Sequence, residues 1–142
     1  MIHKLDDQVS VAPQIAPGEL GELAEDGFAM VINNRPDHEE HGQPLASAIC
    51  EAARAAGMDY VEIPVTPGGF TAEMVAAMAD ALAKAKGPVL AFCRSGTRST
   101  SLWALAEASR GVSADALITK AAAAGYDLSG LRPTLETLAA RA

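Results

Sequence analysis

Four short apolar runs along the chain predict β-strands. Residues 9–11 alternate briefly between apolar and polar, whereas residues 28–32 and 89–92 are continuously apolar, as expected for strands buried on both faces. The fourth run, residues 60–65, ends at a Thr-Pro-Gly-Gly sequence. Because helical segments separate these runs, we expect a mostly parallel, four-stranded sheet flanked by helices.

Apolar residues at helical spacing fill the segments between and after the strands. The first helix is predicted to begin at Pro17 and end at Gly27, and the second to span residues 44–56 before Gly57. The third begins at Thr71, a favourable N-cap residue. Only helices follow the last strand, over residues 98–109, 114–123 and 133–140. The pattern therefore predicts an α/β fold with an all-helical C-terminal end, in a single domain of residues 1–142.

The segment Phe92-Cys93-Arg94-Ser95-Gly96-Thr97-Arg98-Ser99 joins the last predicted strand to a helix. A thiol at a helix N-terminus ionises more readily than a free one, because unpaired backbone N–H groups stabilise the negative charge. The same N–H groups, with the nearby arginines and hydroxyls, can hold a bound anion. We therefore predict that Cys93 is a thiolate nucleophile near neutral pH and that Arg98 takes part in catalysis.

The carboxyl ends of parallel strands meet at one edge of a sheet, where ligands bind in this class of fold. We expect three loops to meet there: residues 33–37, residues 64–70 and the cysteine loop. This topology brings Arg35 towards Cys93. The predicted substrate-binding residues are Arg94, Ser95, Gly96, Thr97, Ser99 and Arg35.

Composition narrows the class of ligand. A net charge of −7 disfavours a general nucleic-acid binder, although a locally basic loop can still capture a small anion.

No apolar stretch approaches the ~18 residues of a membrane span, and the N-terminus lacks a signal-type apolar run. Cys50 and Cys93 show no metal-ligand spacing, and His38 and His41 are expected in a solvated loop. We therefore expect a cytoplasmic protein without metal or cofactor.

The local sequence from Cys93 to Arg98 is similar to the loop of rhodanese-type sulfurtransferases, whereas the cysteine phosphatases place five residues between their Cys and Arg. The all-helical C-terminal end and residues 31–37 (Val-Ile-Asn-Asn-Arg-Pro-Asp) resemble the dual-specificity phosphatase fold. Together with Gly42-Gln43-Pro44 and Gly125-Tyr126-Asp127-Leu128, these motifs resemble a bacterial family, the beta-lactamase-hydrolase-like, phosphatase-like domain family, also described as a sulfurtransferase family.

The resemblance implies a small anionic or persulfide substrate. In some members of that family the domain is fused to a metallo-hydrolase-type domain resembling persulfide dioxygenases. A partner of that kind is therefore implied for this chain.

The two reactions differ in their need for an acid. Hydrolysis of an alcohol phosphate ester needs a general acid, worth about 10²–10⁴-fold in rate. In the phosphatases this is usually an Asp on a loop upstream of the cysteine, but residues 64–70 contain no acid. Asp37, Glu39 and Glu40 on the neighbouring loop are the available substitutes.

Sulfur transfer needs no acid, because sulfite and thiolates leave readily. We therefore predict a cysteine-dependent sulfurtransferase that carries sulfur as a Cys93 persulfide. A cysteine-dependent phosphatase with a phosphocysteine intermediate is one alternative. A catalytically inactive module that binds an anion or a partner is the other.

Overall fold

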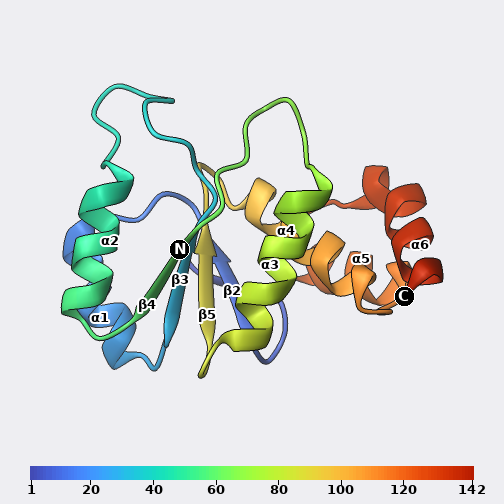
Figure 1. Ribbon diagram of the computed structural model, residues 1–142, viewed down its shortest axis with the longest axis horizontal. Coiled ribbons are helices and arrows are strands. Elements are labelled where there is room, and N and C mark those ends of the chain that lie inside the picture. The colour runs from blue at the N-terminus through green and yellow to red at the C-terminus, as the bar shows by residue number, and fades with distance from the viewer.

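The computed structural model describes residues 1–142 and has a central sheet with helices on both faces (Figure 1). The strands are β1 (His3–Lys4), β2 (Val9–Ala12), β3 (Met30–Asn33), β4 (Asp59–Glu62) and β5 (Val89–Phe92). The α-helices are α1 (Leu20–Glu25), α2 (Ala46–Ala55), α3 (Ala72–Lys84), α4 (Thr97–Ser109), α5 (Ala114–Ala123) and α6 (Arg132–Arg141). The 3₁₀ turns η1 (Pro17–Glu19) and η2 (Ser129–Leu131) lead into α1 and α6.

The sheet has the strand order β1-β2-β5-β3-β4. The four predicted strands are present, and each pairs in parallel with its neighbours among the four. The expected total of four strands is wrong, because β1 adds a fifth strand antiparallel to β2 at the edge. Two residues are too few to show the alternation that marks a strand in a sequence, although their partners in β2, Val11 and Ser10, lie close by in the chain.

The sheet separates two hydrophobic cores. Alternate residues of β5 show the division: Val89 and Ala91 belong to the larger core, whereas Leu90 and Phe92 belong to the smaller one. The smaller core packs under α1 and α2, and the larger lies on the side of α3 to α6 (Figure 1). Both central strands, β3 and β5, are buried throughout, which explains their continuously apolar sequences.

Helix α4 occupies the centre of the larger core and packs against α3, α5 and α6. Nine of its residues are buried, including Trp103, and apolar or small residues cover most of its circumference. The Trp103 indole donates to Asp6 Oδ2 at 3.2 Å, so its buried N–H is satisfied. Because α4 begins directly after the cysteine loop, this packing anchors the loop on a helix that cannot readily move.

The predicted helices all occur, with shifts at their ends. The helix expected from Pro17 starts as η1 before α1, and the helix expected at residue 44 starts as α2 at Ala46. Helix α5 has the predicted bounds. None of the helices is both long and apolar enough to cross a membrane.

Candidate active site at the Cys93 loop

The three loops expected at the carboxyl edge of the sheet do meet there, and Asn34 joins them. Its backbone N–H donates to Phe92 O at 2.9 Å, at the start of the cysteine loop. Its side-chain amide donates to Ile63 O at 3.0 Å and accepts a hydrogen bond from Ser99 Oγ at 2.8 Å. Asn34 is fully buried, so this one side chain fixes the spacing between the β3, β4 and β5 loops.

Cys93 lies between the end of β5 and the first turn of α4. Its sulfur accepts a hydrogen bond from the Gly96 backbone N–H at 3.1 Å, and the residue is only 1% exposed. Gly96 is the N-cap residue of α4 and has a φ of 90°, a left-handed conformation that glycine adopts without strain. The amino end of α4 therefore faces the sulfur, which is the placement that the sequence predicted.

Arg98 approaches this loop from the first turn of α4 and forms a two-pronged ion pair with Glu39. Its Nη1 and Nη2 donate to the two Glu39 carboxylate oxygens, each at 2.8 Å. Nη1 also donates to the carbonyl oxygen of Val65 at 2.7 Å. The pKa of Arg98 is raised, chiefly by the hydrogen bonds to Glu39 and also by the proximity of Cys93. The guanidinium is therefore held beside the sulfur in a fixed orientation.

A count of the guanidinium N–H groups shows how many donors of Arg98 remain for a bound anion. A guanidinium has five N–H donors, and Glu39 and Val65 take three of them. The other two, on Nε and Nη2, make no hydrogen bond to a protein oxygen. They lie on one edge of the guanidinium and form a fork that matches two oxygens of an anion. Glu39 thus leaves the anion-binding edge of Arg98 available.

A second acidic residue extends this network to the other two arginines. Arg35 is 2% exposed and donates to Glu39 at 3.0 Å, to Glu40 at 3.3 Å and to Gln14 Oε1 at 3.1 Å. Arg94 is mostly exposed and reaches Glu40 at 3.4 Å. Each nitrogen of the Arg35 guanidinium already bonds a protein oxygen. This geometry favours a role in holding the two glutamates, and the predicted contact of Arg35 with substrate stays a prediction.

The acidic residues of this loop all accept hydrogen bonds or form ion pairs. Hydrogen bonding from Arg98, and then from Arg35, lowers the pKa of Glu39 from 4.5 to about 2. Asp37 Oδ1 accepts the Ala46 backbone N–H at 2.8 Å, at the start of α2. Glu40 is half exposed and pairs with two arginines. Glu39 therefore carries no proton to donate at neutral pH.

The other predicted binding residues fall into two groups. Ser95 and Thr97 are exposed, and their hydroxyls lie 3.0 Å apart at the mouth of the loop. Ser99 is buried and donates to Asn34, which places it behind the loop. The predicted functions of all three residues stay predictions.

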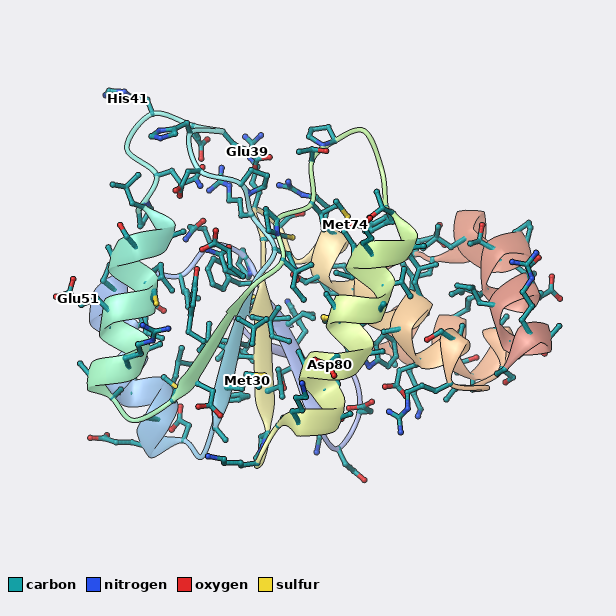
Figure 2. The ribbon with its side chains drawn as sticks, in the orientation of Figure 1. Met30, Glu39, His41, Glu51, Met74 and Asp80 are labelled. Atoms are coloured by element: carbon teal, nitrogen blue, oxygen red, sulfur yellow. The ribbon has the colours of Figure 1, made fainter.

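A polar hollow of about 470 Å³ is lined by Glu39, Pro67, Arg94 and Arg98. Figure 2 shows Glu39 above the carboxyl edge of the sheet, with His41 at the outer tip of the same loop. No group of three or more His, Cys, Asp or Glu residues is arranged to hold a metal ion. The lining of the hollow is suited to an anion.

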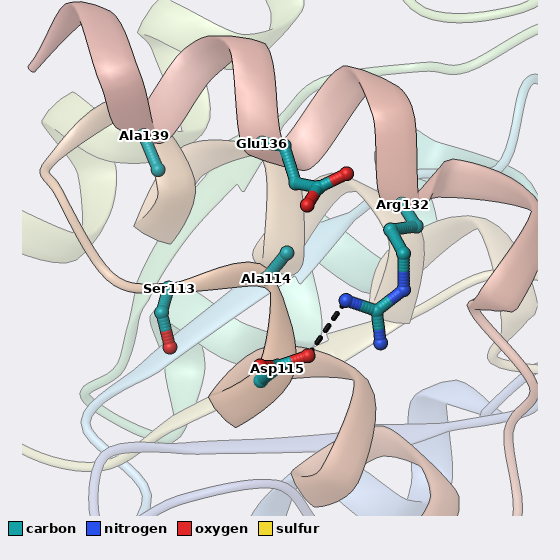
Figure 3. A pocket seen from close by; sticks show the side chains of 6 residues that line it. All are labelled: Ser113, Ala114, Asp115, Arg132, Glu136 and Ala139. Carbon is teal, nitrogen blue, oxygen red and sulfur yellow. Dashed lines mark hydrogen bonds and ion pairs between the residues drawn. The ribbon is translucent and has the colours of Figure 1, made fainter.

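A second hollow lies between the amino end of α5 and one side of α6, and no residue of the cysteine loop lines it (Figure 3). Its volume is about 230 Å³, and the side chains that project into view include the Asp115–Arg132 ion pair and Glu136 (Figure 3). Arg132 Nη1 donates to Asp115 at 2.6 Å, but both side chains are exposed, and such pairs contribute about 0–1 kcal/mol. The hollow contains no thiol, and its one hydroxyl, that of Ser113, caps α5 by accepting the Ala116 backbone N–H.

A sequence model of the family described as "Beta-lactamase hydrolase-like protein, phosphatase-like domain" matches residues 2–110. The chain belongs to this family. The Beta-lactamase hydrolase-like protein of Agrobacterium fabrum is 40% identical over 105 residues, which are 74% of this chain and 24% of that protein. The one of Xylella fastidiosa (strain Temecula1) is 35% identical over 128 residues, 89% of this chain and 30% of that protein. The matched part of the chain thus spans only 24% to 30% of the length of these relatives.

Solved structures confirm the phosphatase-like fold. The crystal structure of a "putative phosphatase (nma1982)" from Neisseria meningitidis has a TM-score of 0.83 and 34% identity, covering 96% of this chain and 97% of that one. The crystal structure of PTPMT1 has a TM-score of 0.78 and 16% identity, covering 99% and 95%. The active form of Tk-PTP has a TM-score of 0.73 and 19% identity, covering 99% and 97%. The last two show likeness of fold alone.

The structure also shows contacts of Glu39, Asn34 and Tyr126 at the site that the sequence did not predict. Glu39 was considered as an acid, whereas it is the anionic partner of Arg98. Asn34 was part of a recognised motif, but nothing in the motif signalled its bonds to Ile63 and Ser99. Tyr126 reaches the cysteine loop from the C-terminal segment. These contacts join residues 29 to 65 positions apart, and only the fold brings them together.

Proposed function

We propose that the protein is a cysteine-dependent phosphatase in which Cys93 accepts a phosphoryl group from an anionic substrate. The observation that carries this proposal is the Cys93 sulfur, bonded by the Gly96 amide at the amino end of α4 and flanked by Arg98. Support comes from the Neisseria meningitidis neighbour, which is 34% identical and is named as a phosphatase, and from the phosphatase-like domain family. This order reverses the expectation from sequence, because nothing in the comparisons supports sulfur transfer over phosphoryl transfer.

In the proposed reaction the free fork of Arg98 and the loop amides bind the phosphoryl oxygens. The Cys93 thiolate attacks phosphorus, an S–P bond forms and the ester P–O bond breaks. The alcohol leaves with the electron pair of the broken bond and takes a proton from water. Water then attacks phosphorus, the S–P bond breaks, and inorganic phosphate and the thiolate are released.

The state of the acidic residues restricts the substrate. Glu39 is ionised and Asp37 is bound to the α2 backbone, so neither carboxyl group is placed to act as the general acid for a departing alkoxide. General-acid catalysis is worth about 10²–10⁴-fold, and a good leaving group makes it unnecessary. The proposed substrates are therefore activated phosphates, such as aryl esters, with little activity expected on simple alkyl esters.

The same absence of an acid favours a second candidate, sulfur transfer. Here the Cys93 thiolate attacks the outer sulfur of a donor such as thiosulfate, the donor S–S bond breaks, and sulfite leaves with the bonding electrons. The resulting Cys93 persulfide gives its outer sulfur to an acceptor thiolate. The four-residue spacing between Cys93 and Arg98, shorter than in the cysteine phosphatases, also favours this candidate.

Turnover with two donors separates the candidates. Purified protein is supplied with an aryl phosphate, or with thiosulfate and cyanide as acceptor, and release of phosphate or thiocyanate is measured. Phosphate release that Cys93→Ser abolishes supports the phosphatase. Thiocyanate formation without phosphate release overturns it in favour of the sulfurtransferase. If neither product forms, the inactive binding module is the remaining account.

The cellular setting and partner are also proposals. Both cysteines are free thiols, which fits the reducing cytoplasm expected from sequence. Because the curated relatives are much longer than this chain, a metallo-hydrolase-type partner resembling persulfide dioxygenases stays a prediction. Copurification of the chain with such a hydrolase would test it.

A further inference from the structure

The Gly125-Tyr126-Asp127-Leu128 motif has no function in the reaction described above, and it lies beyond residues 2–110 that the family model matches. It directly follows α5. The Tyr126 N–H donates to Ala121 O at 2.9 Å, and Leu128 is buried in the larger core. The Tyr126 ring also packs edge-on against His3, with ring centroids 5.7 Å apart. The backbone and the ring of Tyr126 are therefore held in place.

This placement directs the Tyr126 hydroxyl at the cysteine loop. Tyr126 Oη donates to the carbonyl oxygen of Ser95 at 3.1 Å. The hydroxyl also lies so close to Gly96 that a Cβ at that position would clash with it. The C-terminal segment thus contacts the cysteine loop at the peptide unit that joins Ser95 to Gly96.

That same peptide unit makes the hydrogen bond to the nucleophile. A trans peptide is planar, so its C=O and N–H point in opposite directions. The Ser95 carbonyl faces Tyr126, and the Gly96 N–H therefore points the other way, to the Cys93 sulfur at 3.1 Å. Fixing one end of the unit fixes the other.

Glycine makes this restraint necessary. Turning the peptide unit over would change the φ of Gly96 from its present 90°, and glycine accepts positive and negative φ about equally. The overturned unit would aim the Ser95 carbonyl oxygen at the sulfur and repel a thiolate or a bound anion. Sterics at Gly96 do not prevent that change, but loss of the Tyr126 hydrogen bond opposes it.

We propose that Tyr126 is a positioning residue, whose hydroxyl holds the Ser95–Gly96 peptide so that the Gly96 N–H stays on Cys93. The all-helical C-terminal end thereby completes the thiolate site. The proposal rests on Cys93 being the reactive thiolate of the proposed function. Burial, with a smaller effect from Cys93, raises the pKa of Tyr126, so the phenol keeps the proton that it donates.

The test is alkylation of Cys93, which needs no turnover. In a Cys50→Ser background, the rate of reaction with iodoacetamide is measured against pH for the parent protein, Tyr126→Phe and Tyr60→Phe. Tyr60 is the matched control, because its hydroxyl bonds Asn33 and Glu62 and makes no contact with the cysteine loop. Cys93→Ser identifies the background reaction.

Tyr126→Phe is expected to shift the inflection of the rate profile to higher pH by up to about one unit, as loss of one hydrogen bond near a charge implies. Tyr60→Phe should keep the parent profile. An unchanged profile in Tyr126→Phe, or an equal shift in Tyr60→Phe, overturns the proposal. If Tyr126→Phe shifts the alkylation profile but the parent protein turns over neither donor, the positioning role of Tyr126 stands and the proposed function fails.

Discussion

The cysteine loop and the β3–α2 loop leave the same edge of the sheet but build the site in different ways. The cysteine loop is short and works through its backbone: one amide, one glycine and a helix end surround the sulfur. The β3–α2 loop is longer and works through charged side chains, since Glu39 and Glu40 pair with arginines from both loops. The first loop holds Cys93, the proposed nucleophile, and the second holds Arg98 through its ion pair with Glu39.

The difference teaches which interactions depend on local sequence. A helix end and a left-handed glycine follow from a few adjacent residues, whereas the Glu39–Arg98 pair joins residues 59 positions apart. Substitutions in the two loops should therefore have distinct effects, as the following predictions describe from the largest to the smallest.

Replacing Arg98 should cause the largest loss after removal of the nucleophile. Arg98→Lys keeps a positive charge but has no fork to match two oxygens of an anion. We expect kcat/KM to fall by about 10²–10³-fold, the usual effect of losing a preorganised donor. Steady-state kinetics with the active donor measure this effect, and Arg110→Lys, an exposed arginine paired with Glu107, is the control. A loss shared by both variants would count against the assignment.

Glu39→Gln shows whether Glu39 orients Arg98 for the substrate or competes with the substrate anion for Arg98. If Glu39 orients Arg98, the neutral amide loosens the ion pair, and kcat/KM should fall about tenfold. If Glu39 instead takes the place of the substrate anion, the same change should improve anion binding and lower KM. Glu40→Gln, in the same loop but with longer contacts, is expected to have a smaller effect. A gain in activity with Glu39→Gln would contradict our account.

Arg94 should matter less than Arg98, because its side chain is 66% exposed and its ion pair is 3.4 Å long. Exposed pairs are weak and screened by salt. Arg94→Ala should therefore lower kcat/KM only about two- to fivefold, and the deficit should shrink at high salt. Kinetics at low and high ionic strength provide the measurement. A loss of kcat/KM as large as that of Arg98→Lys would contradict the smaller role that the exposure of Arg94 predicts.

The depressed pKa of Glu39 predicts a pH dependence of folding stability. Arg98, and then Arg35, lower this pKa from 4.5 to about 2, so the folded state favours the ionised form. The resulting stability is fully present above about pH 4.5 and is lost as the pH falls towards 2. Chemical denaturation should show the parent more stable than Glu39→Gln at pH 6, with a difference that shrinks between pH 4.5 and 2. A constant difference would show that the charge of Glu39 is not responsible.

The sequence predicted the fold class, the four parallel strands and the place of Cys93 between the last strand and a helix, because each depends on patterns within a few residues. It did not predict β1, because a strand of two residues is too short to show an alternating pattern. It did not predict that Glu39 would be the partner of Arg98, or that Tyr126 would reach Ser95, because neither contact has a local signal. The recognised motifs contained Asn34 and Tyr126, but their partners became visible only in three dimensions.

The central claim is that Cys93 takes a group covalently from an anionic substrate, and intact-mass spectrometry tests it most directly. The protein is mixed with an aryl phosphate, quenched in acid within the first turnover, and weighed. Our account predicts the added mass of one phosphoryl group, absent in Cys93→Ser and present in Cys50→Ser. An unmodified protein during continuing phosphate release, or an adduct that survives in Cys93→Ser, would contradict it.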